Sequence, residues 1–235
     1  MKKSKFLLIS VFFAICFCFF GCGNNQNLII QEKLSEVRYN LFMCQNDEVV
    51  VKFSSGFRED PYILNGKSEN KKEFGIITVK FLKNIPNKST LPTFVITISD
   101  MDFDGEFELN PFDQTYVQDI ETFVLDESSV YIKISFGDFS FASSLKNVSK
   151  DFVINHKDAL NTFVKTYQKD IQQILKSGGD FEIYVKIIND PSLEIDKNYF
   201  YVCLISTIGE SYSVVIDPQN GNILAKNESK TQVVL

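Results

Sequence analysis

The most specific chemical motif in the sequence is DMDFDG at residues 100–105. Alternating carboxylates at Asp100, Asp102 and Asp104 match the first half of an EF-hand calcium loop, in which a glycine then permits the bend. The twelfth position must supply a bidentate carboxylate, but it is Pro111 here, and residues 93–99 predict a strand rather than a helix. We therefore favour a β-hairpin that turns at residues 104–105, and keep the three aspartates as a calcium alternative.

A second candidate is the segment FREDPY at residues 57–62, which combines an arginine, two acids and two aromatic rings. Loops on a rigid β scaffold commonly carry recognition, so Phe57, Arg58, Asp60 and Tyr62 form a candidate partner-binding loop. The alternative is an internal ion pair of Arg58 with Glu59 or Asp60 that only fixes the loop.

Catalytic chemistry finds little support in the sequence. Acidic pairs that involve residues such as Asp102 and Glu108 suit a glycosidase only when they flank a substrate groove. A single histidine excludes an HExxH metal site, and the chain has no glycine-rich phosphate loop and no Cys-x-x-Cys motif. We expect no enzyme activity, no cofactor and no bound metal.

The N-terminus predicts export. Lysines at positions 2, 3 and 5 precede an apolar run over residues 6–20, which is shorter than the roughly 20 residues that cross a bilayer. The run ends at Gly21-Cys22, which resembles the lipobox of bacterial lipoproteins. The resemblance implies a signal peptide over residues 1–21, cleavage before Cys22, acylation of the Cys22 sulfur and a lipidated tether over residues 22–29. The expected location is the extracytoplasmic face of the cell membrane.

The charge of the chain limits its partners. The expected signal peptide holds three of the 24 basic residues and none of the 30 acids, which leaves a net charge of −9 on the remainder. Nucleic acids are bound mainly through Lys and Arg on phosphates, so this charge argues against them. It also argues against docking on anionic lipid through a basic patch.

Two cysteines, Cys44 and Cys203, would remain free after acylation of Cys22. Export permits a disulfide between them. The alternative, which we favour, is a pair of buried thiols, because free cysteine is among the most buried residue types.

Residues 30–150 show the period-two alternation of β-strands, broken by frequent turn signals. This pattern predicts an antiparallel, sandwich-like domain whose filling is mostly phenylalanine. The polar stretch over residues 54–73 predicts a long loop. Strands are expected at residues 37–43, 49–53, 74–82, 93–99, 103–109, 129–135 and 139–145.

Residues 151–228 change in character. Asn155 followed by Asp158 predicts a helix start, and apolar residues then recur at helical spacing up to Leu175. Gly178-Gly179 predicts the helix end. Strands are expected at residues 181–188, 198–207 and 211–216, followed by a tail over residues 229–235.

The order of one helix and three antiparallel strands over residues 157–226 resembles a PepSY-type module. The likeness depends on the helix over residues 159–175, the aromatic strand at 199–202, and a strand, Asp217 and Asn220-Gly221 before aliphatic residues. The resemblance implies an inhibitory or chaperoning role in the cell envelope. It implies no propeptide role within this chain, which has no HExxH.

The expected fold class is therefore α+β, with a sandwich-like β-rich domain followed by a helix-on-antiparallel-sheet, PepSY-like domain. The expected function is that of a non-catalytic lipoprotein, anchored in the bilayer through Cys22, that binds an envelope protein or peptide and no nucleic acid. Two alternatives stay open: a calcium-dependent or carbohydrate-binding adhesive module, and a hydrolase that uses acidic residues.

Overall fold

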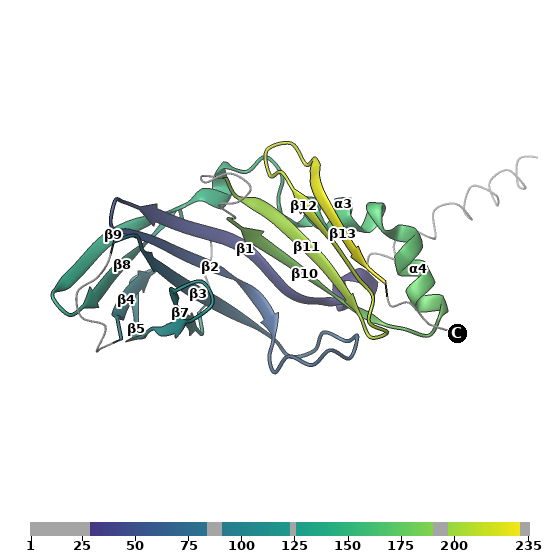
Figure 1. Cartoon of the computed structure of the whole chain (residues 1–235), viewed down its shortest axis with the longest axis horizontal. Helices are drawn as coiled ribbons and strands as arrows, with labels where there is room; N and C mark the ends of the chain where they lie inside the picture. Colours follow the sequence, from purple (N-terminus) through teal and green to yellow (C-terminus); the bar gives the residue numbers. More distant parts are fainter. Residues whose placement is uncertain (1–28, 84–90, 123–125, 190–196, 231–235) are drawn as a thin grey trace, which may run out of the picture.

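The structure, a computed structural model, describes residues 29–83, 91–122, 126–189 and 197–230. Within these ranges thirteen strands form one continuous sheet (Figure 1). Its strands pair antiparallel, except that β1 runs parallel to β10. Among the described residues, the helices lie between β9 and β10, apart from a helical turn at residues 29–32 before β1.

Nine strands curl into a nearly closed, barrel-like part, in the order β5-β4-β8-β9-β1-β2-β3-β7-β6. The two end strands of this order are joined by the single residue Phe107, whose buried ring contacts Phe94 at 5.0 Å between centroids. Inward-facing Phe, Ile and Val side chains fill the interior. The strands are β1 (Leu34–Gln45), β2 (Val49–Glu59), β3 (Lys71–Phe81), β4 (Thr93–Ile98), β5 (Met101–Glu106), β6 (Glu108–Asn110), β7 (Thr115–Ile120), β8 (Ser129–Phe136) and β9 (Phe139–Asn147).

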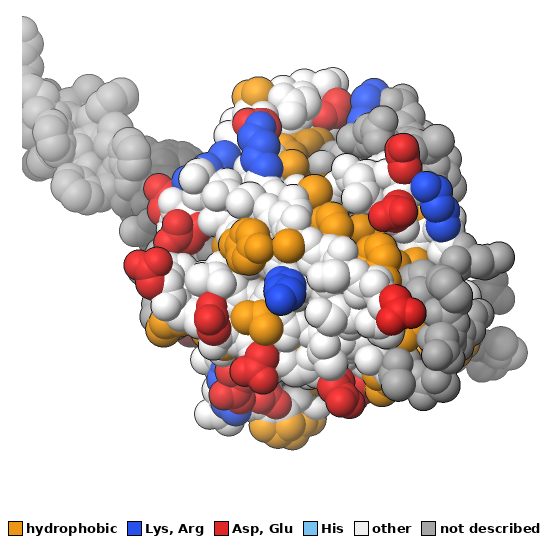
Figure 2. All heavy atoms as spheres, turned by 90° about the vertical axis from the view of Figure 1, so that its left-hand side faces the viewer, with side chains coloured by type: hydrophobic (Ala, Val, Ile, Leu, Met, Phe, Trp, Pro, Cys, Tyr) orange, Lys and Arg blue, Asp and Glu red, His pale blue; other side chains and the backbone are white. Residues whose placement is uncertain are grey.

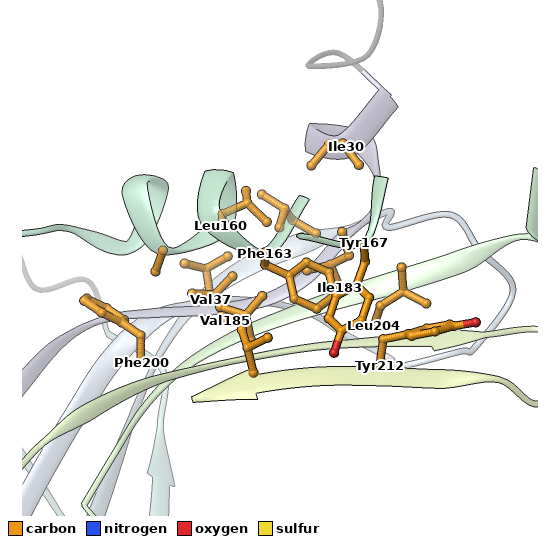
Figure 3. Packing of buried hydrophobic residues seen from close by; sticks show 14 of the residues in the cluster. Ile30, Val37, Leu160, Phe163, Tyr167, Ile183, Val185, Phe200, Leu204 and Tyr212 are labelled. Carbon is orange, nitrogen blue, oxygen red and sulfur yellow. The ribbon is translucent and has the colours of Figure 1, made fainter. Parts of the chain in front are cut away.

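The remaining strands extend the same sheet from the other side of β1. The parallel register joins Leu34 of β1 to Ile183 of β10, and β11, β12 and β13 follow in order. Helix α3 packs on one face of this part, where Phe163 and Val37 of β1 belong to the same buried core (Figure 3). The elements are η1 (Val148–Asp151), α3 (His156–Thr166), α4 (Gln168–Lys176), β10 (Phe181–Ile188), β11 (Tyr199–Ser206), β12 (Ser211–Ile216) and β13 (Ile223–Ser229).

The predicted α+β fold class is wrong. The structure is mostly antiparallel β-sheet, and the strands after residue 150 continue the first sheet instead of forming a separate helix-on-sheet, PepSY-like domain. Strand β1 joins the two parts physically, because Leu34, Val37 and Leu41 enter the core under the helices while Phe42 enters the barrel-like core. The domain boundary expected near residue 150 stays a prediction.

The loop predicted over residues 54–73 is shorter than expected, because both of its predicted ends lie within strands. Strand β2 continues through Glu59, and β3 begins at Lys71. Ser54 and Ser55 are buried, and they lie in the ladder with β1. Gly56 explains the close approach of β1 and β2, because a Cβ there would lie 1.8 Å from the Val37 carbonyl oxygen.

Helix signals in the sequence are confirmed at both ends. Asn155 accepts hydrogen bonds from the backbone amides of Lys157 and Asp158, and the Asp158 carboxylate accepts from the Asn155 amide. The expected single helix is instead two helices that meet at Tyr167, whose buried ring packs on Tyr212. Gly178 has φ of +79° after the end of α4, as a helix-terminating glycine requires.

Candidate functional site

The helices cover one face of strands β10 and β11, and the opposite face carries a pocket of about 440 Å³. Strand alternation places its residues: Ile183 and Val185 enter the core, so Tyr184 and Lys186 point the other way. The lining side chains come from β1, β2, β10, β11 and the loop after β2, and are Ser35, Glu36, Arg58, Glu59, Tyr62, Tyr184, Lys186, Tyr201, Cys203 and Ile205.

The loop over residues 60–70 forms one wall of the pocket and is held by a buried carboxylate. Glu182 of β10 is 0% exposed. Its Oε1 accepts the backbone amides of Asn65 at 2.9 Å and Gly66 at 3.1 Å, and its Oε2 accepts the Tyr184 hydroxyl at 3.1 Å. One side chain therefore fixes both the loop and an aromatic ring of the pocket.

Further bonds fasten the same loop to the start of β1. Lys33 forms an ion pair of 2.7 Å with Asp180 and also donates to the Gly66 carbonyl. Gly66 has φ of +75°, and a Cβ there would lie 2.3 Å from the Asp180 carboxyl carbon. Both constraints require glycine at this position. The loop is thus held in place before any ligand binds.

Glu59 anchors the wall from the other end. Its buried carboxylate accepts the Ser35 hydroxyl at 3.2 Å and the Glu69 backbone amide at 3.2 Å. The Ser68 hydroxyl donates to the Leu34 carbonyl at 2.5 Å. These contacts connect the loop to β1, so the pocket has a rigid floor and a fixed wall.

Three tyrosines, Tyr62, Tyr184 and Tyr201, supply the aromatic surface of the pocket. The ring of Tyr62, which is 52% exposed, meets Tyr184 edge to face with centroids 6.0 Å apart. Burial raises the pKa of the Tyr184 phenol, and the neighbouring Tyr62 and Glu182 raise it further. Burial also raises the pKa of Tyr201. Both phenols stay protonated at neutral pH and act as hydrogen-bond donors rather than as anions.

Three of the four charged residues that line the pocket, Glu36, Arg58 and Lys186, form ion pairs. Glu36 accepts Arg38 Nε at 2.5 Å and pairs with Lys186 Nζ at 3.0 Å. Burial alone would raise the pKa of Glu36, but the two cations outweigh it and lower that pKa. Arg58 pairs with Asp119 at 3.0 Å, with its guanidinium 4.6 Å from the centroid of the Phe74 ring. An ionic ligand would have to displace these partners, whereas an apolar group would not.

The predicted partner-binding loop is only partly brought together. Arg58 and Tyr62 both line the pocket. Phe57 lies on the opposite face of β2, packed against the core under the helices, and Asp60 pairs with Lys72 at 3.0 Å outside the pocket. The predicted ion pair of Arg58 with Glu59 or Asp60 is wrong. Arg58 pairs instead with Asp119 on β7.

Sequence reasoning missed Tyr184, Lys186 and Tyr201. The available signal was their alternation with the aliphatic residues of β10 and β11, which marks a second face. That alternation does not reveal whether the second face is open to a ligand, because the covering loop comes from a distant segment.

The aspartates of the calcium alternative lie along an exposed hairpin. The turn falls at Ser99 and Asp100, both with positive φ, and the expected turn at residues 104–105 is wrong because these residues belong to β5. Asp102 accepts the Thr97 hydroxyl at 2.7 Å. Throughout the described ranges, no group of three or more His, Cys, Asp or Glu side chains is arranged to hold a metal ion.

The two cysteines do not form a disulfide. Cys203 is buried at the pocket, where burial raises the pKa of its thiol, and Cys44 is half-buried beside the Ser143 hydroxyl at 3.2 Å. Cys22, the expected lipidation site, lies outside the described residues.

Comparison with protein families, curated proteins and solved structures finds no match to this chain. Among the described residues, no helix combines the length and the apolar character that a membrane crossing requires. The site therefore has to be interpreted from its own chemistry.

Proposed function

We propose that this protein is a non-catalytic lipoprotein, anchored through Cys22 outside the cytosol, that binds an envelope protein or peptide. The pocket on the open face of β10 and β11 is the proposed binding site. The observation that carries the proposal is the combination of three tyrosine rings with a wall fixed by buried carboxylates. Tyrosines on a preorganised surface supply much of the binding energy of protein interfaces.

The chemistry of the pocket favours an apolar side chain of the partner as the group that enters. The charges of Glu36, Arg58 and Lys186 are satisfied within the fold, so they favour neither an ionic ligand nor proton transfer. The tyrosine rings offer apolar surface and edge-to-face contacts, which suit an aliphatic or aromatic residue. The polar rim would hydrogen-bond to the partner's backbone.

Capture from membranes tests this proposal. The protein with Tyr201→Ala is expected to recover a specific partner on the order of 10- to 30-fold less than the unaltered protein, the range of an interface hot spot. The matched control is Tyr131→Ala, which removes a half-exposed tyrosine from β8, outside the pocket. Equal recovery by both variants, at unchanged melting temperatures, would reject the pocket as the binding site.

A further inference from the structure

A small apolar groove lies at the end of the molecule where the described chain begins. It has a volume of about 110 Å³ and runs between Ile29 and Ile30 on one side and Val164, Ile171 and Leu175 on the other. Ile29 and Leu175 are 39% and 40% exposed. Helix α4 thus carries an apolar surface that no described element covers.

The length of chain before the groove limits what can cover it. Cys22 precedes Ile29 by seven residues, and an extended residue spans at most about 3.6 Å, so the acylated sulfur would lie within about 25 Å of the groove. Of the exposed apolar surfaces, this one is joined to the proposed anchor by the shortest tether. The bilayer is therefore the nearest apolar partner.

Local charge supports the same partner, although the chain as a whole is acidic. Lys165, Lys169 and Lys176 of the two helices are all exposed. Asp170, the acid of α4, is already paired with Lys230 at 3.1 Å. At the opposite end of the molecule, acidic side chains are spread across the surface (Figure 2). The expectation from net charge, that no basic patch faces anionic lipid, stays a prediction, and the exposed Glu32 lies near the same groove.

We infer that the helix α4 end, with Ile29, Leu175 and the three lysines, rests on the membrane interface. The inference rests on the proposed lipid anchor, which in the cell would hold this end of the molecule near a bilayer. Leu175 and Ile29 would enter the headgroup region, and the lysines would contact anionic lipid. The pocket between β10 and the loop after β2 would then be held at a fixed orientation to the bilayer.

Tryptophan fluorescence tests this orientation directly, because the chain contains no tryptophan. Leu175→Trp places a reporter at the groove, and Phe112→Trp places the control reporter at the turn before β7, in the other half of the molecule (Figure 1). Each variant, lipidated, is reconstituted in phosphatidylcholine–phosphatidylglycerol vesicles with brominated acyl chains. We expect strong quenching for Leu175→Trp and none for Phe112→Trp.

A second experiment tests the orientation of the molecule independently of acylation at Cys22. The chain from residue 22 onward, with a hexahistidine tag in place of the lipid, is held on vesicles by a chelating lipid. Quenching of Leu175→Trp in this arm upholds the orientation even if Cys22 proves unmodified. Equal quenching at both positions, or none at position 175, overturns it. In untethered protein with Leu175→Trp, Lys169→Glu changes the charge by two units and is expected to weaken binding to anionic vesicles about 30-fold at low salt.

Discussion

Phe163→Ala is expected to lower the free energy of unfolding by about 3–5 kcal/mol, the range for truncating a fully buried phenylalanine. Phe163 of α3 is 0% exposed and lies in the core that also contains Val37 of β1. Because β1 also enters the barrel-like core through Phe42, loosening its first half should destabilise both parts of the sheet. We therefore expect one cooperative transition at a lower denaturant concentration.

The measurement is denaturant unfolding followed by circular dichroism, with hydrogen exchange to separate the two parts of the sheet. Phe112→Ala is the matched control, since Phe112 is 96% exposed and its removal should change stability by no more than about 0.5 kcal/mol. Two transitions, with exchange increased only after residue 150, would contradict the single unit and favour the domain boundary that the sequence predicts.

Glu182→Ala is expected to cost about 3 kcal/mol and to release the loop over residues 60–70. The substitution leaves the amides of Asn65 and Gly66 and the Tyr184 hydroxyl without their acceptor, and a buried donor without a partner costs about 1–3 kcal/mol. The loop can recover part of this cost by opening to water. Hydrogen exchange of the Asn65 and Gly66 amides should therefore accelerate.

Glu182→Gln provides the control for this prediction. Its amide oxygen keeps one acceptor for the loop, so the loss of stability should be smaller than that of Glu182→Ala. Partner capture should follow the same order. If Glu182→Ala leaves both the melting temperature and loop exchange unchanged, the carboxylate does not hold the wall of the pocket.

Local sequence signals predicted the elements that depend on near neighbours. The Asn155–Asp158 capping box needs only four consecutive residues. Strands such as β8 and β10 can be predicted from the alternation of apolar and polar residues. The parallel pairing of Leu34 with Ile183 has no such signature, because its partners lie about 150 residues apart in the sequence. The fold class was predicted wrongly because this pairing of β1 with β10 could not be foreseen from the sequence.

The candidate site also combines residues that local sequence could single out with residues that only distant contacts bring together. Tyr62 and Arg58 could be singled out because aromatic and charged residues concentrate in one segment. The rest of the pocket depends on Glu182, which as a strand acid looks solvent-exposed in the sequence. Only the tertiary structure brings the amides of Asn65 and Gly66 over it. A buried acid that binds a distant loop cannot be distinguished by sequence from an exposed one.

Thiol labelling on intact cells tests the central claim, that the chain is displayed outside the cytosol with its pocket engaged by a partner. Tyr62→Cys places a thiol at the pocket rim, and Val153→Cys places one at a site that is 72% exposed and outside the pocket. With a membrane-impermeant maleimide, we predict labelling of both thiols without lysis, and slower labelling at position 62 in cells than in the purified protein. Labelling that requires lysis would contradict the display outside the cytosol, and equal rates at position 62 in cells and in purified protein would contradict an engaged pocket.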